Sequence, residues 1–289
     1  MKKPAALLWL LIAAVSLTAQ SPWTLPQKGY YLQLSYGLIP AYNSLFGRGG
    51  EPFSTSRKIT DHTIQFFGEY GISGNLTVQL RLPYKILSSG DLNPEFEGNA
   101  GEIPAAGSHM SFGNGGVGFK YRLTASAWAS AVYLSYDAPA PGKDQETALL
   151  TGYPVHAFSP GFSAGRGWEK FYTWFRAGTR LHTGGYSDYI TAAAEGGYLI
   201  SRGLYLIGYL DLYESLRNGS VPIPTDPERF GLYANNQEHF SFGVKLLKQW
   251  KTNSGDRFGM VAGGAGSFYA FDLPHAPYLN LGLFYKTGP

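Results

Sequence analysis

The segment Leu76–Leu87, LTVQLRLPYKIL, alternates between two kinds of side chain along its whole length. Its even positions, from Leu76 to Ile86, are apolar or tyrosine, and its odd positions include Arg81 and Lys85. A period of two residues predicts a β-strand with one apolar face and one polar face. In a soluble sandwich the apolar face would enter a core. In a membrane barrel it would meet lipid, and Arg81 would line a lumen.

The same alternation recurs along the chain. It is clear in five further segments: Tyr30–Leu38, Ile64–Tyr70, Val117–Leu123, Phe240–Leu246 and Leu279–Tyr285. Their polar faces carry full charges in mid-strand, which suits a wet lumen better than a thin sandwich. About twelve strands are expected, most of them close to the 9–11 residues that a tilted strand needs to cross a bilayer. Two glycine-rich segments, near 156–167 and 257–271, do not show which of their faces is apolar.

The connections between these strands differ in length at the two ends. Short connections fall at 71–75, 124–126, 168–170, 201–203 and 251–255. Longer ones fall between them, near 39–58, 87–111, 138–155, 183–187, 217–235 and 273–276. Short periplasmic turns and long extracellular loops are typical of outer-membrane barrels, and closure removes the exposed edges of so large a sheet. We therefore predict an all-β, antiparallel transmembrane β-barrel over residues 20–289.

Composition agrees with export and excludes several classes of protein. Residues 1–19 contain two lysines, an apolar run and small residues near Ala19, which predicts a secretory signal peptide. No later apolar run reaches the roughly 20 residues of a spanning helix. The chain has no cysteine, which excludes disulfides and cysteine-based metal sites or nucleophiles. A net charge of +3, without a basic cluster, argues against a nucleic-acid partner.

Two blocks of sequence also carry a resemblance. FFGEYGISGNLTVQLRLPY, residues 66–84, followed by GGVGFKYRL, residues 115–123, resembles a family of outer-membrane channels associated with meta-pathway phenol degradation. Related barrel proteins of Bacteroidetes are similar. The resemblance implies a monomeric channel for small compounds, aromatic ones among them.

Charged residues on the inward faces are the candidate site of such a barrel. Seven basic residues, including Arg81, Lys120, Arg122, Arg176 and Lys245, face three acidic ones, Glu69, Glu195 and Asp211. Turn counting places Arg176, Glu195 and Tyr209 at one level, with Asp211 diagonal to them. Two interpretations stay open: a network that braces the wall, because lumenal charges need partners, or a charged ring that selects solutes. The excess of basic residues predicts a preference for anions.

Aromatic residues fall on the inward and the outward faces. Those predicted to face inward include Trp174, Tyr205 and Tyr209, which either fill space or offer a track for an amphipathic or aromatic solute. Outward aromatic residues are expected in two belts, one near each end of the strands. Tyr36, Tyr84, Tyr136 and Tyr278 are placed in the belt beside the long loops.

Three other features suggest alternatives. His109 and Ser111, in HMSFGN, resemble the His-x-Ser pair of barrel lipid hydrolases, although a plain loop is the simpler interpretation. Six histidines fall near the long loops, where a metal or pH-responsive site is conceivable, but none share a ligand spacing. The acidic second loop, with Asp91, Glu95, Glu97 and Glu102, suits either calcium binding or a solvated loop.

The sequence therefore predicts an outer-membrane channel for passive passage of small solutes. We expect a monomer in contact with outer-membrane lipid, with no cofactor, no metal and no enzymatic activity. A closed barrel with a structural, adhesive or assembly role is the main alternative, and a lipid hydrolase is the second.

Overall fold

The computed structural model describes residues 21–47, 51–97, 103–223 and 233–287. The predicted signal peptide, residues 1–19, lies outside this part of the chain. No helix among the described residues is long and apolar enough to cross a membrane. The elements are a short 3-10 helix, Pro94–Phe96, and the strands β1 Tyr30–Phe46, β2 Pro52–Gly71, β3 Leu76–Leu92, β4 Gly107–Phe112, β5 Gly116–Ala125, β6 Ala129–Asp137, β7 Ala157–Gly167, β8 Phe171–His182, β9 Tyr189–Ser201, β10 Leu204–Ser215, β11 Glu238–Lys251, β12 Arg257–Phe271 and β13 Tyr278–Lys286.

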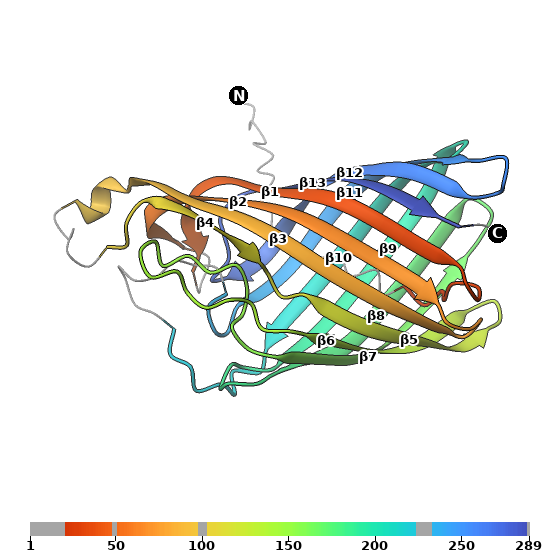
Figure 1. Cartoon of the computed structure of the whole chain (residues 1–289), viewed down its shortest axis with the longest axis horizontal. Coiled ribbons are helices and arrows are strands. Elements are labelled where there is room, and N and C mark those ends of the chain that lie inside the picture. Colours follow the sequence, from red (N-terminus) through yellow and green to blue (C-terminus); the bar gives the residue numbers. More distant parts are fainter. Residues whose placement is uncertain (1–20, 48–50, 98–102, 224–232, 288–289) are drawn as a thin grey trace, which may run out of the picture.

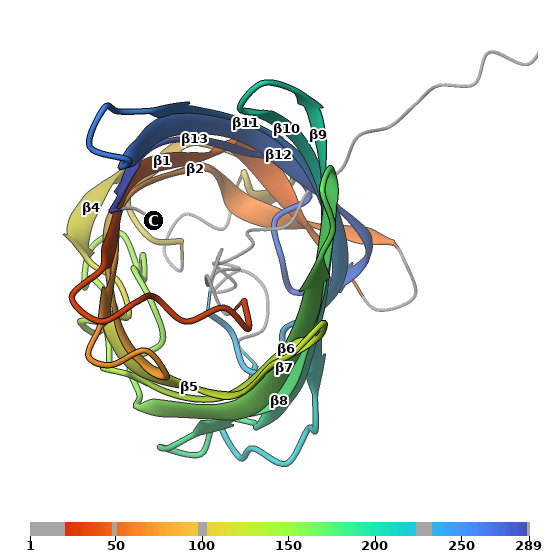
Figure 2. The ribbon, with the colours of Figure 1, turned by 90° about the vertical axis from the view of Figure 1, so that its right-hand side faces the viewer.

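The strands form one antiparallel barrel that closes on itself (Figures 1 and 2). β1 pairs with β2 on one side and with β13 on the other, and β2 also pairs with β3. β4 pairs with Tyr84–Ser89 of β3, and β5 pairs with Leu76–Arg81 of the same strand. Because β4 and β5 follow one another along β3, they share one position in the wall. The predicted twelve-stranded barrel is therefore confirmed.

The facing of β3 shows what kind of barrel this is. Leu80 and Leu82 are 42% and 39% exposed, whereas Thr77 on the opposite face is fully buried. The apolar face thus lies outside and the polar face inside, the inverse of a soluble domain. The two glycine-rich strands, whose apolar face the sequence did not show, follow the same rule. Phe158 and Phe162 of β7 point outward, as do Phe258 and Met260 of β12.

The ends of the barrel differ, as the sequence predicts. We call the end with the turns β2–β3, β5–β6, β7–β8, β9–β10 and β11–β12 the short-turn end, and the opposite end the long-loop end. At the long-loop end the strands run further than expected. The predicted loops 39–58 and 87–111 are in part strand, because β1 continues to Phe46, β2 begins at Pro52, β3 continues to Leu92 and β4 covers Gly107–Phe112. A register shift between Ile39 and Tyr42 interrupts the alternation, which hides this extension in the sequence.

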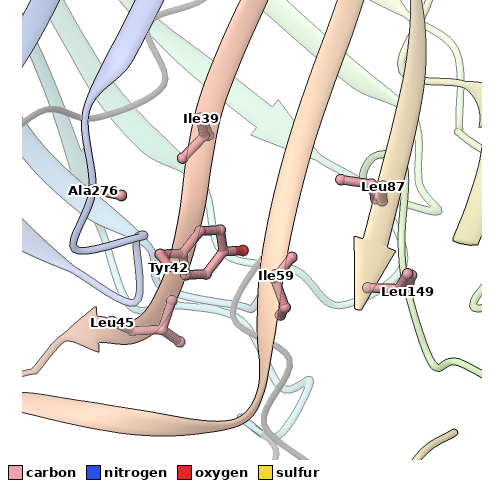
Figure 3. Close-up of a cluster of buried hydrophobic side chains, with 7 residues drawn as sticks. All are labelled: Ile39, Tyr42, Leu45, Ile59, Leu87, Leu149 and Ala276. Carbon is pink, nitrogen blue, oxygen red and sulfur yellow. The ribbon is translucent and has the colours of Figure 1, made fainter. Parts of the chain in front are cut away.

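The strand extensions enclose a small apolar core inside the long-loop end (Figure 3). Its members, which are all nearly inaccessible to solvent, are Ile39, Tyr42, Leu45, Ile59, Leu87, Leu149 and Ala276. Here the inward face of β1–β3 changes from polar to apolar, and loop residues Leu149 and Ala276 cover it. Tyr278 packs against this core from the inner side of β13, so its predicted place in the outer aromatic belt is wrong.

Candidate functional site

The lumen contains a cavity of about 230 Å³ toward the long-loop end. Its wall includes charged side chains of β2, β3, β6, β8 and β10, and loop residues Tyr153, Tyr233 and Leu273 border it as well. Side chains nearer the short-turn end, such as Lys120, Glu195 and Lys245, do not line it. The predicted lumenal charges therefore fall into separate groups along the barrel.

Asp137, at the end of β6, holds two arginines in the wall of the cavity. Arg81 of β3 donates a hydrogen bond from Nη2 to Oδ1 of Asp137. Nη1 of Arg180 on β8 lies 2.7 Å from the other oxygen, Oδ2. Both guanidinium groups are largely buried, so these contacts form in a poorly solvated place. This is the one lumenal carboxylate among the described residues that pairs with two arginines.

Arg176 of β8 pairs with Asp211 of β10, and not with Glu195. Its Nη2 donates to Oδ1 of Asp211 at 2.9 Å, and Nε2 of His239 lies 3.3 Å from Oδ2. The expected level of Arg176 was wrong by two residues, because Arg176 and Asp211 both pair with Ala193 of β9. The small side chain of Ala193 leaves the long arginine free to reach across one strand.

Glu195 forms the centre of a second group, nearer the short-turn end. Its Oε2 accepts from Nζ of Lys245 at 2.8 Å, and its Oε1 accepts from the Tyr172 hydroxyl at 2.9 Å and from Nε1 of Trp174 at 3.1 Å. The Lys245 ammonium also lies 4.4 Å from the ring centroid of Tyr209, within cation–π range. Trp174 is therefore bound to a carboxylate rather than open to a solute. Tyr205, which faces inward on β10, pairs with Leu199 of β9 and Leu247 of β11.

The charged groups of Lys120 and Arg122 on β5 lie in different surroundings. Lys120 is fully buried, and its Nζ lies 3.1 Å from Oε1 of Glu69, which also accepts from Nε2 of Gln79 at 2.7 Å. Arg122 lies at the short-turn end and donates to the amide oxygen of Asn75 at 2.7 Å. Its charge has no carboxylate partner among the described residues.

We expect Lys120→Met to destabilise the folded barrel by about 3–5 kcal/mol, because Glu69 would remain as a buried carboxylate without its cation. The double variant Lys120→Met/Glu69→Gln should recover much of this loss. Unfolding by urea in lipid vesicles measures the free energy of unfolding. Lys170→Met, which removes an exposed lysine from the β7–β8 turn, serves as the control. Equal losses in the single and double variants would contradict a buried ion pair.

Two inward carboxylates, Asp61 and Asp137, were absent from the sequence prediction. Asp61 accepts from Nζ of Lys85 at 2.5 Å, and the same ammonium donates to the Tyr233 hydroxyl at 2.6 Å. The alternation in the sequence could have identified both aspartates. Asp61 continues the inward-facing positions of β2, and Asp137 continues those of β6. With them counted, most basic groups in the cavity and in the middle of the lumen are neutralised locally. One positive charge remains in the cavity, where four basic side chains face three carboxylates, and most of the predicted excess of charge lies elsewhere.

Further basic groups without an ion pair among the described residues lie at the short-turn end. Arg257 of β12 and Lys286 of β13 pair directly across the ladder, with inward-facing side chains. Neither forms an ion pair within the described residues, and both Glu69 and Lys120 are in electrostatic reach of Lys286. Like charges that face each other across two strands are destabilising. With Arg122 they give this opening a net positive charge.

Several inward aromatic rings lie against the wall instead of projecting into the lumen. A Cβ at position 243 would lie 2.2 Å from the ring carbon Cζ of Tyr209, and one at position 161 would lie 2.2 Å from the hydroxyl oxygen of Tyr133. Gly243 and Gly161, on the neighbouring strands, thus provide the space in which these rings lie flat. This placement keeps large residues in the lumen without closing it.

We expect Gly243→Ala to lower conductance, because the added methyl group displaces the Tyr209 ring toward the lumen. Single-channel recording of the purified protein measures the effect. Gly208→Ala is the matched control, since a Cβ at that position meets nothing within 4 Å. An unchanged conductance in Gly243→Ala, with the control also unchanged, would show that the ring does not border the conducting path.

Tyr233 and Gln237, from the loop before β11, line the cavity at the long-loop end, and Asn235 lies between them in the sequence. The Tyr153 hydroxyl donates to Oε1 of Gln237 at 2.8 Å, and Asn235 accepts from the backbone N–H of Ser187 at 2.9 Å. Burial raises the pKa of both Tyr153 and Tyr233, so their hydroxyl groups remain protonated and can donate. Hydrogen bonds thus join three different loops over the cavity.

An N-terminal strap, residues 21–28, crosses the opening at the short-turn end, where it is drawn in red in Figure 2. The backbone N–H of Leu25 donates to Oγ1 of the buried Thr77 on β3 at 2.9 Å. On the far side, Trp23 packs edge-on against Tyr172 of β8, with ring centroids 6.0 Å apart. Because β5, β6 and β7 separate β3 from β8, the strap spans part of the lumen.

The alternative sites from the sequence do not assemble. His109 and Ser111 lie on the same face of β4, opposite the exposed Met110, but they form no hydrogen bond with each other among the described residues. Nδ1 of His109 instead lies 3.6 Å from Asp144. His109–Phe112 is also a strand and not the expected loop.

The acidic loop and the histidines give no metal site in the described part of the chain. No group of three or more histidine, aspartate or glutamate side chains there could hold an ion. Asp91, Glu95 and Glu97 are exposed, and Glu102 lies outside the described residues.

Comparisons with known proteins agree with the barrel. Neither a comparison with protein-family models nor one with curated proteins finds a match. Among solved structures, an outer membrane channel from Pseudomonas putida F1 has a TM-score of 0.64 and 17% identity, covering 95% of this chain and 100% of that chain. The NanC porin has a TM-score of 0.48 and 6% identity, covering 90% and 100%. The CymD monoaromatic hydrocarbon channel has a TM-score of 0.43 and 12% identity, covering 96% and 94%.

The first of these likenesses shows the fold. The predicted fold of an all-β, antiparallel barrel is therefore confirmed. The narrower resemblance to the phenol-degradation family stays a prediction.

Proposed function

We propose that this chain is an outer-membrane channel through which small solutes pass passively. One observation carries the proposal: the wall is apolar outside, while charged and tyrosine side chains inside surround a cavity of about 230 Å³. An apolar exterior requires lipid, and a charged interior suits a wet passage. Export by the predicted signal peptide would place the short-turn end in the periplasm and the long-loop end outside the cell.

The proposed protein is a monomer that needs no cofactor and carries out no reaction. Most charged groups of the lumen form ion pairs in the wall, and His109 and Ser111 form no hydrogen bond with each other among the described residues. Arg81, Lys120, Arg176, Glu195, Asp211 and Lys245 therefore brace the barrel as a network. Selectivity falls to the uncompensated groups, Arg122 among them.

Planar bilayer recording of the purified protein tests the proposal. Discrete conductance steps are the expected result. A preparation that is folded, as judged by heat-modifiable migration on a gel, and that gives no current would favour the closed barrel with a structural role. The loops over the cavity and the N-terminal strap are the features that favour this second candidate.

A further inference from the structure

The cavity carries an uneven set of charges. Three carboxylates line it, and two of them have one strong base each: Asp61 with Lys85, and Asp211 with Arg176. The third, Asp137, has two arginines. Arginine, lysine and aspartate side chains alone therefore give the cavity one positive charge more than it has negative charges.

The two arginines also retain unused donors. Each guanidinium has five N–H groups. Among the described residues, Arg81 donates only to Asp137, and Arg180 contacts Asp137 and donates from Nε to His182 at 3.1 Å. The side chains of both border the cavity. A carboxylate that enters beside them would pair with the second arginine and remove the excess charge, through the short, charge-assisted bonds that guanidinium groups form with carboxylates.

The size and the other walls of the cavity restrict the rest of the ligand. A volume of about 230 Å³ is below the range of roughly 300–1,000 Å³ for drug-sized ligands. The rings of Tyr133, Tyr153 and Tyr213 line the cavity, two of them within electrostatic reach of Arg180. Aromatic faces and hydroxyl groups suit a single planar ring better than a flexible chain.

We propose that the cavity binds small organic monocarboxylates carried on a single planar ring, with the carboxylate held by Arg81 and Arg180. The proposal rests on the channel function above and names its class of solute. A cation is disfavoured because the cavity is already positive. A neutral ring of the same shape would leave the excess charge unmatched.

Fluorine NMR on the full mature chain in detergent tests this assignment with three probes of similar shape. We expect para-fluorobenzoate to bind roughly tenfold or more tightly than para-fluorobenzyl alcohol, as a charge-assisted hydrogen bond predicts. The cation para-fluorobenzylammonium should bind weakest. Arg180→Gln should reduce benzoate affinity to the level of the alcohol without unfolding the barrel, because Asp137 retains Arg81. Arg180→Lys, which keeps the charge, should restore part of the affinity.

Arg122→Gln is the matched control, since Arg122 does not line the cavity. Equal affinity for the acid and the alcohol, or full benzoate binding in Arg180→Gln, would overturn the proposal. Because binding is measured without current, the two proposals fail separately. Benzoate binding by a protein that does not conduct would support the site and contradict the channel. Conductance without benzoate binding would support the channel and contradict the carboxylate site.

Discussion

Removal of the N-terminal strap should raise the conductance of the channel by roughly twofold or more, because residues 21–28 lie across the opening at the short-turn end. Thr24 and Lys28 of the strap donate hydrogen bonds to the backbone carbonyls of Gly74 and Gly71, and two further contacts hold it at β3 and β8. At β3 the backbone N–H of Leu25 donates a hydrogen bond to Thr77, and at β8 the ring of Trp23 packs against Tyr172. Protein refolded without residues 1–28, recorded in planar bilayers, tests the effect.

Two point substitutions separate the loss of the strap's contacts from the loss of its residues. Thr77→Val removes the buried acceptor at nearly constant volume, and Trp23→Ala removes the far contact; each should give intermediate conductance or flickering currents. Trp128→Ala is the control, because this tryptophan lies at the same end of the barrel but is exposed on its outer side. If the shortened chain conducts no better than the parent, the limiting constriction lies elsewhere, at the aromatic side chains of the lumen or at the loops.

The fold could be predicted from the sequence because every strand of the barrel must place apolar side chains outside and polar side chains inside. In LTVQLRLPYKIL the alternation assigns each side chain to lipid or lumen, and the structure places Leu80 outside and Thr77 inside accordingly. The rule fails where the backbone departs from the pleat. Near Ile39 a register shift changes which residues face inward, and the predicted loop is instead part of a core.

The partners of the lumenal charges were harder to predict than their facing. Arg176 and Asp211 lie on strands that are not neighbours, and they meet because both align with the small Ala193. A pairing across one strand depends on the register of two ladders and on the size of the residue between them. An error of two residues in one turn, such as the one that linked Arg176 to Glu195, is enough to exchange the partner.

Charge selectivity should depend on the opening at the short-turn end rather than on the middle of the lumen. Arg257 and Lys286 face each other and form no ion pair among the described residues, whereas Arg81 forms an ion pair with Asp137. We therefore expect the parent channel to prefer anions in a salt gradient. Arg257→Gln/Lys286→Gln should shift the reversal potential toward cations, and Arg122→Gln should add to this shift.

The same double variant also tests a prediction about the free energy of unfolding. Removing two like charges from directly opposed positions should leave the free energy of unfolding unchanged or raise it, unlike the loss expected for Lys120→Met. The selectivity change should fade toward 1 M salt, where the screening length falls to about 3 Å. Arg166→Gln/Lys248→Gln neutralises two outward-facing bases on β7 and β11 at the same end and should leave the reversal potential unchanged. A parent channel that prefers cations would show that the acidic residues of the long loops, and not this basic opening, control which ions enter.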